Sequence, residues 1–318
     1  MQLHTLCLFS LASSPVIAQA TSSDNSTWPN SFPKQIVANR RRTGLTTAEY
    51  LYHHTIVHGR KAWNAPDSID QPIAYVQDHA FDSAYGINTT AQGINTPQVS
   101  YFGHSDVTEL YSRSQEAFFT PPPNNYTQDV IGPDGNAFSD FSASISMYAY
   151  EDFQAVNSSC VITESSELFN AFYFVFANAE NANQFSFDNA TFAAAIMQTL
   201  LASLPYGSIY NASIHTSVPG LDARLYYGGM DNPTLSAVLK FWLCDDNLAV
   251  SSFRIAQLGL ISQNDELGIN LDESFVMFTR ATLIYDRASA IPFDDERAKQ
   301  ALLNDRFRGD LAGPPVLA

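Results

Sequence analysis

The sequence predicts an α+β protein made of two successive units, each with the element order β-α-β-β-α-β. Two observations lead to this class. Short segments in which apolar and polar residues alternate recur along the chain, as is typical of strands. Longer apolar or amphipathic stretches of helical length lie between them, and the same order occurs twice, over residues 34–155 and 165–287.

The first unit begins with a short apolar segment at 34–40, which is expected to form a strand. A helix should follow from Thr46, because Thr46 and Glu49 have the spacing of a capping box, and Gly59 should end it. Later segments of the unit are expected as strands at 72–82, 106–113 and 141–150, a helix that begins within 114–119, and an irregular loop at the proline- and glycine-rich stretch 121–136.

The second unit has stronger signals. Its expected elements are strands at 168–180, 208–215, 234–244 and 274–286, and helices at 188–205 and 247–258. Pro205 and Gly207 should stop the first of these helices. Residues 288–318 are expected to form a C-terminal helix at 294–305 and a loose tail.

Each unit corresponds to a ferredoxin-like split βαβ fold, whose four-stranded sheet carries its helices on one side only. The other side needs cover, and two such sheets that meet face to face would cover each other. The fold class expected is therefore an intramolecular pseudo-dimeric α/β barrel, formed by two ferredoxin-like repeats of one chain. A monomer follows as the expected state.

The N-terminal segment indicates export. Residues 1–20 contain an apolar stretch and end in Ala18-Gln19-Ala20, the pattern of a signal peptide cleavage site, and residues 21–33 are expected to be a flexible arm. No later stretch is apolar over the length that a membrane span needs. A secreted glycoprotein is expected, since six N-x-[ST] sequons are present, at Asn25, Asn88, Asn125, Asn157, Asn189 and Asn211.

Two cysteines, Cys160 and Cys244, lie outside the expected signal peptide. In an oxidising compartment they could form one disulfide between distant segments, or remain two buried thiols. The sequence leaves both readings open.

The net charge of −16 opposes binding to nucleic acid or to an anionic membrane surface, both of which favour a basic protein. Six of the sixteen basic residues are nevertheless close together in the sequence: Lys34, Arg40, Arg41, Arg42, Arg60 and Lys61. They are interpreted as a solvated face, with a small-anion site as the alternative.

Three of the seven histidines, His53, His54 and His58, fall within residues 50–59. The surrounding stretch RRTGLTTAEYLYHHTIVHG (41–59) resembles the first helix of EthD-like proteins of the dimeric α/β-barrel superfamily. YVQDH (75–79) resembles the second strand of that family, and DVTELY (106–111) the third. One departure is that Arg60 and Lys61 stand where the family usually has a proline.

This resemblance implies a cofactor-free pocket for a small molecule within the barrel. It also implies chemistry on aromatic polyketides or related ring compounds, by dehydration, cyclisation, decarboxylation or oxidation. The partner expected is thus a small hydrophobic or aromatic molecule, bound without nucleic acid or membrane.

The residues themselves suggest acid–base chemistry, because the pKa of imidazole lies near neutrality. We expect His58 to act as the base, with His79 and Tyr75 as proton donors. The wall of the substrate site is expected to include Gln77, His54, Tyr50 and Tyr111, although His53 and His54 could also simply pack against the sheet. Each of these histidines and tyrosines could instead be a satisfied core residue.

A metal site is not expected. His54 and His58 have i, i+4 spacing, but Thr55 stands where a metalloprotease HExxH motif has glutamate, and no third ligand is evident. The sequence also lacks a G-x-S-x-G elbow, a P-loop and a G-x-G-x-x-G motif, and no axial haem ligand can be nominated. No cofactor is expected.

The function expected is a secreted, cofactor-independent enzyme of secondary metabolism, a dehydratase or cyclase of a polyketide-type aromatic or reactive ring precursor. The alternatives are a cofactor-independent oxygenase, a secreted binding protein for a small hydrophobic ligand, and a structural protein of the cell surface. Histidines that point away from the pocket would favour the binding protein.

Overall fold

The computed structural model describes residues 31–86, 103–120, 123–156, 169–178, 188–227, 229–244 and 246–303. Several sequence predictions lie outside these residues and are not addressed by the structure: the signal peptide at 1–20, the sequons at Asn25, Asn88 and Asn157, Cys160, and the tail from residue 304. In the described part of the chain, no helix is both long and apolar enough to cross a membrane.

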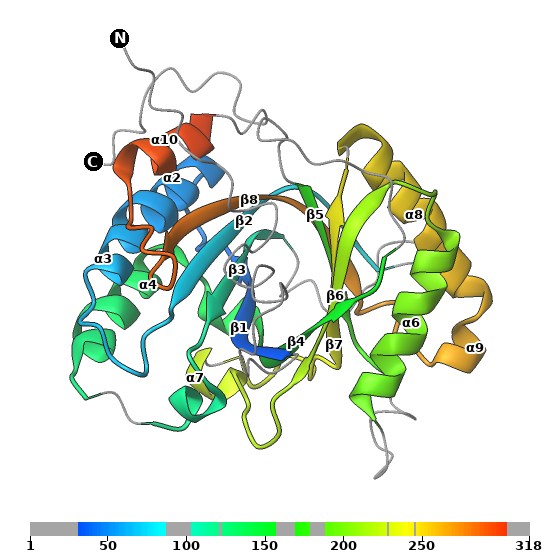
Figure 1. The fold of residues 1–318 in the computed structure, drawn as a ribbon, viewed down its shortest axis with the longest axis horizontal. Helices are drawn as coiled ribbons and strands as arrows, with labels where there is room; N and C mark the ends of the chain where they lie inside the picture. The colour runs from blue at the N-terminus through cyan, green and yellow to red at the C-terminus, as the bar shows by residue number, and fades with distance from the viewer. Residues whose placement is uncertain are drawn as a thin grey trace.

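Eight antiparallel strands form a closed barrel in the order β1-β3-β2-β8-β5-β7-β6-β4 (Figure 1). The first half of the chain contributes β4-β1-β3-β2 and the second half β8-β5-β7-β6, the same order of strands twice. The pairs β2–β8 and β4–β6 join the halves. The predicted fold class, an intramolecular pseudo-dimeric barrel, is confirmed. The strands are β1 (Ser31–Arg40), β2 (Ala74–Tyr85), β3 (His104–Tyr111), β4 (Ile145–Gln154), β5 (Phe169–Val175), β6 (Ile209–Ser217), β7 (Ala237–Leu243) and β8 (Phe275–Asp286).

The helices cover the outside of the barrel on two opposite sides (Figure 1). The first-half side carries α2 (Thr47–Tyr52), η3 (His53–His58), α3 (Gly59–Trp63), η6 (Thr127–Ile131), α4 (Gly132–Phe138) and the C-terminal α10 (Asp295–Leu303). The second-half side carries α6 (Asn189–Ser203), α8 (Asp246–Ser262) and α9 (Asn264–Leu267). Short helical turns occur at η5 (Gln115–Phe118), η7 (Phe141–Ala143) and α7 (Arg224–Tyr227).

The first helix begins as predicted but does not end at Gly59. Thr46 and Glu49 form the expected capping box, and the helix then continues through the π-helical segment η3 and α3 as far as Trp63. Gly59 has a helical φ of −57°. A Cβ atom there would lie 2.9 Å from Cγ2 of Ile284 and 3.2 Å from Phe293. The glycine is therefore required for close packing against β8, and the prediction that it stops the helix is wrong.

The second helix of the first half was also predicted in the wrong place. The stretch 114–119 forms only the short 3₁₀ turn η5, whereas η6 and α4 lie in the stretch predicted as a loop. Pro133 lies just after the point where η6 runs without a break into α4. Gly135 is needed because a Cβ there would lie 2.5 Å from the ring of Phe141. These two residues looked like turn signals but are accommodated by the helix.

Side chains fill the inside of the barrel. One part is apolar and includes Ile36, Val107, Ile145, Phe172, Phe174, Val238, Phe275 and Met277. The other part is a cluster of buried ionisable groups, called here the ion cluster: Lys34, Glu109, Glu151, His215 and Lys240. The two sheets thus cover each other through these described side chains.

The ion cluster joins strands of both halves. Lys34 contacts Glu109 and lies 3.0 Å from Oε2 of Glu151, while Lys240 donates to Oε1 of Glu109 at 2.5 Å. Glu151 also lies 3.1 Å from Nε2 of His215. Burial alone would raise the pKa of Glu109, but the charges of Lys240 and Lys34 outweigh it and lower this pKa. Both glutamates are thus held as carboxylates in the interior.

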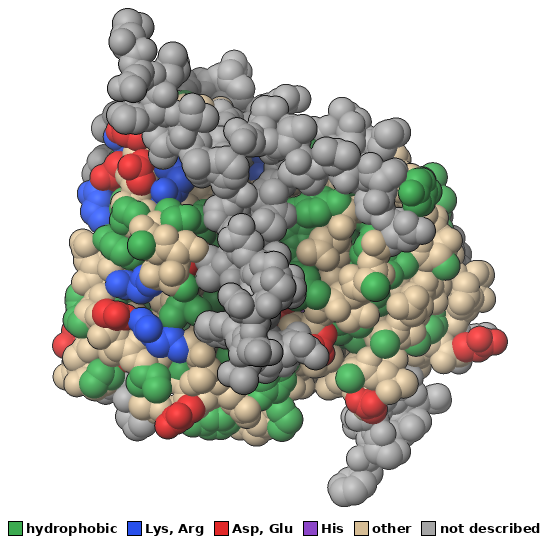
Figure 2. Space-filling view, viewed as in Figure 1, with side chains coloured by type: hydrophobic (Ala, Val, Ile, Leu, Met, Phe, Trp, Pro, Cys, Tyr) green, Lys and Arg blue, Asp and Glu red, His purple; other side chains and the backbone are tan. Residues whose placement is uncertain are grey.

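The predicted basic face is not a continuous patch. Lys34 belongs to the interior, because its side chain is fully buried. Arg60 pairs with Asp295, and Lys61 with Asp134. In the view of Figure 2, basic and acidic side chains are interspersed on the side of α2, α3 and α10. The solvated-face interpretation is wrong for Lys34.

We expect Lys240→Met to lower the free energy of unfolding by about 3–5 kcal/mol, because it leaves the two buried carboxylates of Glu109 and Glu151 with only one lysine, Lys34, between them. Urea denaturation measures this change. The control is Lys299→Met, which removes an exposed i, i+3 partner of Glu296 and should have almost no effect. Equal effects of the two variants would contradict a structural role for the ion cluster.

Candidate active site

A cavity of about 350 Å³ lies between the outer face of the first-half sheet and the helices that cover it. Strand residues such as Val37 and Leu110 form its floor, and residues of η3, η6 and α4 cover it. This cavity of the described residues lies on the helix-facing side of the sheet, whereas the resemblance implies a pocket within the barrel. Aromatic rings dominate the lining: Tyr75, Phe118, Phe138, Phe141, Tyr148, Tyr226, Tyr227 and Tyr285.

His58 lines this cavity and is held by a carboxylate behind it. Its Nδ1 lies 2.8 Å from Oδ2 of Asp134, which also contacts His53 and Lys61 through Oδ1. Burial alone would raise the pKa of Asp134, but hydrogen bonds from His53, His58 and Lys61 outweigh it and hold the pKa well below its usual range. An ionised Asp134 accepts a hydrogen bond from Nδ1–H of His58, so the lone pair of the neutral imidazole is on Nε2.

The pKa of His58 itself is lowered, mainly by burial, although Asp134 partly offsets this. A lowered pKa keeps the imidazole neutral at pH 7, because the charged form is disfavoured. His58 thus has the protonation state and the tautomer of a general base.

Tyr75 lies at the same cavity and is backed by a second histidine–carboxylate pair. Nε2 of His54 is 2.7 Å from the Tyr75 hydroxyl, and Nδ1 of His54 is 2.6 Å from Oδ2 of Asp106. Burial alone would raise the pKa of Asp106, but the charge and hydrogen bond of His54 outweigh it and lower that pKa. The order Tyr75–His54–Asp106 is a chain of hydrogen bonds that leads away from the cavity.

Gln77 fixes the direction of these hydrogen bonds. Its side-chain nitrogen donates to the Tyr75 hydroxyl at 2.7 Å and to the backbone carbonyl of His54 at 3.0 Å, and its oxygen accepts from Thr55 at 2.8 Å. Since the Tyr75 oxygen accepts from Gln77, its own proton is directed to Nε2 of His54. Burial raises the pKa of Tyr75 well above its ordinary value, so Tyr75 is a proton donor at neutral pH.

The ring of Phe138 contacts all three neighbouring histidines of the first helix. Phe138 stacks on His54 with ring centroids 4.7 Å apart, meets His58 edge-on at 5.0 Å, and lies 5.2 Å from His53. His53 and His58 share Asp134, whereas His54 uses Asp106. The three imidazoles thus pack around a single aromatic side chain of α4.

Of the predicted site residues, His58, Tyr75 and His54 line the cavity. His79 does not: it is buried behind it, 3.2 Å from Oγ1 of Thr55. Tyr50 and Gln77 are also buried behind the cavity, and Tyr50 donates to Asp106 at 3.0 Å. Tyr111 lies on the opposite, interior face, with the ammonium group of Lys34 4.8 Å from its ring centroid.

The sequence analysis did not find the two carboxylates. Asp106 opens the recognised DVTELY segment, so its position on a strand next to the histidine helix could have suggested it. Asp134 stands in a stretch predicted as a loop, and no local pattern joins it to His58.

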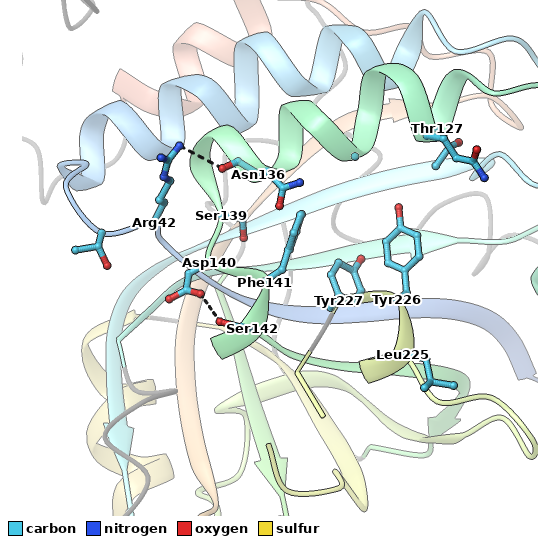
Figure 3. A pocket seen from close by; sticks show the side chains of 13 residues that line it. Arg42, Thr127, Asn136, Ser139, Asp140, Phe141, Ser142, Leu225, Tyr226 and Tyr227 are labelled. Atoms are coloured by element: carbon cyan, nitrogen blue, oxygen red, sulfur yellow. Dashed lines mark hydrogen bonds between the residues drawn. The ribbon is translucent and has the colours of Figure 1, made fainter. Parts of the chain in front are cut away.

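An open groove of about 900 Å³ adjoins the cavity (Figure 3). Both are lined by Thr127, Gly132, Phe141, Tyr226 and Tyr227, so the groove leads to the cavity. Figure 3 shows Tyr226 and Tyr227 facing the helices of the first half. These tyrosines belong to α7, which comes from the second half of the chain. The second half therefore supplies part of the entrance.

The corresponding space of the second half is filled. There, α6 and α8 pack on the outer face of the sheet through a continuous apolar core that includes Tyr173, Phe192, Ile196, Leu200, Leu239, Phe241 and Phe253. In the described residues, the histidine–carboxylate arrangement at a cavity belongs to the first half alone.

Glu109, Glu151 and His215 are the one group among the described residues with enough nearby ligand atoms for a metal, all within 4.8 Å of one another. Lys34 and Lys240 contact these carboxylates, so positive charge is already supplied by the protein. This group does not resemble a metal centre.

The structure describes only some of the residues predicted to form a disulfide or to carry glycans. Cys244 is disulfide-bonded, but Cys160 lies outside the described residues, so their pairing stays a prediction. Asn125 is exposed, and Asn189 and Asn211 are half-buried. Glycosylation at these positions also stays a prediction.

We expect the pKa of His58, followed by NMR titration of its ring protons, to lie below 6.5. Asp134→Asn should lower it further, because the carboxylate favours the charged imidazole. The control is Asp129→Asn, an exposed acid on η6 that should leave this pKa unchanged. A pKa that rises in Asp134→Asn would contradict the proposed pairing.

Comparison with known proteins gives one family match. The family described as EthD domain matches residues 42–142. No curated protein matches the chain. A structure from Lactobacillus acidophilus, provisionally assigned as a monooxygenase, has 12% identity and a TM-score of 0.37, and covers 79% of this chain and 95% of its own. A chlorite dismutase variant from Candidatus Nitrospira defluvii has 11% identity and a TM-score of 0.40, and covers 86% of this chain and 96% of its own. Both histidine–carboxylate pairs lie within residues 42–142, the segment that is similar to the EthD domain family.

Proposed function

We propose that the protein is a cofactor-independent acid–base enzyme that dehydrates or cyclises a small aromatic or reactive ring compound bearing a carbonyl group. One observation carries this proposal. A neutral histidine with a free Nε2 lone pair and a protonated tyrosine line the same aromatic cavity, each backed by its own carboxylate.

The first step is enolisation. Nε2 of His58 removes a proton from the carbon next to the carbonyl, and the electron pair of that C–H bond forms a C=C bond. The electrons of the C=O π bond move to the oxygen, which receives a proton from Tyr75. General acid and base groups of this kind each contribute about 10²- to 10⁴-fold in rate.

His54 and Asp106 support the donor. Nε2 of His54 holds the Tyr75 hydroxyl from one side, and Asp106 in turn holds the imidazole of His54 through Nδ1. Gln77 donates to the same tyrosine oxygen, which stabilises negative charge that develops there.

The second step releases water or closes a ring. In dehydration, the enol expels a hydroxyl from the neighbouring carbon, His58 returns its proton to that hydroxyl, and Tyr75 recovers its own from the enol. In cyclisation, the enol carbon attacks a second carbonyl of the same molecule, whose oxygen takes the proton from His58, and Tyr75 recovers its own proton from the enol oxygen as the first carbonyl re-forms. Both routes return every protein group to its starting state.

The size and lining of the cavity suit such a substrate. A volume of about 350 Å³ is at the lower end of the range for small-molecule pockets, which are mostly apolar with a few convergent polar groups. The ring faces of Phe118, Phe138 and Tyr148 offer stacking surface to an aromatic ligand.

We also infer that the enzyme is secreted and glycosylated. The support is the signal-peptide pattern at 1–20 together with six sequons. The disulfide at Cys244 agrees with an oxidising compartment.

We expect deletion of the gene in its source organism to cause a metabolite to accumulate, and the purified protein to convert that metabolite with loss of water or ring closure. His58→Gln should reduce kcat by about 10²- to 10⁴-fold, and Tyr75→Phe by at least about 10-fold, because each removes one proton-transfer group. Mass spectrometry of the product identifies the reaction.

The control is His53→Gln, which removes a third partner of Asp134 that does not line the cavity. It should retain most of the activity. Turnover that survives in His58→Gln would refute the proposed base. Tight binding of the metabolite without conversion by the wild type would favour the binding-protein alternative.

A further inference from the structure

Asn39 of β1 lies next to two polar side chains of β3 on the outer face of the first-half sheet. Strand pairing places Asn39 opposite Asp106, and Thr108 lies two residues further along β3 on the same face. Asn39 and Thr108 line the cavity, whereas Asp106 is fully buried. The register of β1 against β3 thus brings an amide, a carboxylate and a hydroxyl together at the edge of the cavity.

Both hydrogens of the Asn39 amide are used. Nδ2 donates to Oδ1 of Asp106 and to Oγ1 of Thr108, each at 2.8 Å. Chemistry fixes the orientation of this amide, because an ionised carboxylate only accepts hydrogen bonds and could not pair with the Asn39 oxygen. Thr108 accepts with its oxygen, so its own hydroxyl hydrogen is left for another acceptor. Asn39 is therefore the origin of two branches of hydrogen bonds.

The first branch runs through Asp106 to Tyr75. Besides the bond from Asn39, Asp106 accepts at Oδ2 from Nδ1 of His54 at 2.6 Å and from the Tyr50 hydroxyl at 3.0 Å. Burial alone would raise the pKa of Asp106, but the charge and hydrogen bond of His54 outweigh it, with help from the Asn39 bond, and lower this pKa. The ionised Asp106 holds Nδ1 of His54, whose Nε2 lies 2.7 Å from the Tyr75 hydroxyl.

The second branch runs through Thr108 to the same hydroxyl. Thr108 lies opposite Gln77 of β2, whose side-chain nitrogen donates to the Tyr75 oxygen at 2.7 Å. Burial raises the pKa of Tyr75, and hydrogen bonds of Gln77 and Thr108 oppose this rise. A hydrogen bond lowers the pKa of a phenol when it is donated to the charged form, so Thr108 acts as a donor to Tyr75.

We propose that Asn39 is a positioning residue for the phenol of Tyr75. Through Asp106 it keeps the imidazole of His54 in place beside that phenol. Through Thr108 it supplies a donor to the phenol oxygen, where negative charge develops as Tyr75 gives up its proton. The consequence for turnover rests on the proposed function, whereas the effect on the hydrogen bonds of Asp106 and Tyr75 does not.

Carbon NMR tests both branches without a substrate. The labels are ¹³C at the aspartate carboxyl groups and at Cζ of the tyrosines, and the variants Asp106→Asn and Tyr75→Phe assign the two resonances. Asn39→Leu should raise the pKa of Asp106, because the ionised form loses a donor. It should also shift the Cζ resonance of Tyr75 at neutral pH, because Thr108 is no longer held as a donor to the phenol oxygen.

Two further variants separate the branches. Thr108→Val removes the second branch alone, so it should shift the Tyr75 resonance in the same direction as Asn39→Leu and leave the pKa of Asp106 nearly unchanged. Asn39→Ser keeps one short donor that cannot reach both neighbours at once. It should change both measurements in the same direction as Asn39→Leu, by a smaller amount.

Asn170→Leu is the matched control. Asn170 of β5 is also a buried asparagine that donates to a buried aspartate, Oδ1 of Asp78 at 2.5 Å, but this pair lies inside the barrel. The variant removes the same kind of hydrogen bond away from the cavity. It should therefore leave both the pKa of Asp106 and the Tyr75 resonance unchanged.

Kinetics with the metabolite that the wild type converts tests the consequence. Asn39→Leu should lower kcat by about 10- to 100-fold, because the proton donor is no longer held in place, and should leave KM within about 3-fold. A raised KM with an unchanged kcat would overturn the inference, because Asn39 would then only contact the bound substrate.

Two NMR results would also overturn it: an Asp106 pKa or a Tyr75 resonance that stays unchanged in Asn39→Leu, or equal changes in Asn170→Leu. The expected NMR changes together with full turnover in His58→Gln would separate the two proposals. Asn39 would remain a positioning residue for Tyr75, and the acid–base mechanism would fail.

Discussion

The ion cluster inside the barrel is the constraint on which the arrangement of the two halves depends. Lys240 of β7 reaches Glu109 of β3, and His215 of β6 reaches Glu151 of β4, so each contact crosses from one half to the other. A third polar contact, from Asn170 of β5 to Asp78 of β2 at 2.5 Å, does the same. Misaligned halves would leave buried charges unpaired, at a cost of several kcal/mol. The cluster thus favours a single register between the sheets.

The two halves differ in the layer between the outer face of the sheet and the helices that cover it. The second half fills this layer with aliphatic and aromatic side chains, whereas the first half places histidines, carboxylates and tyrosines in it. The second half still contributes to the site through Tyr226 and Tyr227 of α7. The matched family segment, 42–142, contains neither these tyrosines nor any of β1, including Gln35. The lining of the cavity therefore extends beyond the family segment.

The architecture could be predicted because the alternation of apolar and polar residues marks each strand locally. The order of strands and helices along the chain then indicates the two repeats. The site was only partly predictable. His58 and His54 belong to a recognisable segment, but their partners Asp134 and Asp106 are brought to them by tertiary contacts over more than fifty residues. The alternation of residues assigns each side chain to one of two faces of a strand. It does not tell which face lies toward the helices and which toward the barrel interior. In β3, Leu110 faces the cavity, whereas its neighbours Glu109 and Tyr111 face the ion cluster. Both faces of this strand are buried, so composition could not separate them.

The π-helical segment η3 limits how this region can change during evolution. A hydrogen bond from the Gly59 N–H to the His54 carbonyl closes its wider turn. This bond joins residues five positions apart, one more than the four of an α-helical bond. His54, at one end of that bond, and His58 within the turn face the cavity, while Gly59, at the other end, lies against Ile284. Deletion of one residue here would restore a regular α-helix. It would also rotate either the two imidazoles or the glycine by about 100° around the helix axis, away from their present contacts. The length of this segment is therefore less free to vary than its composition, and related chains that keep both contacts should differ here by substitution and not by deletion.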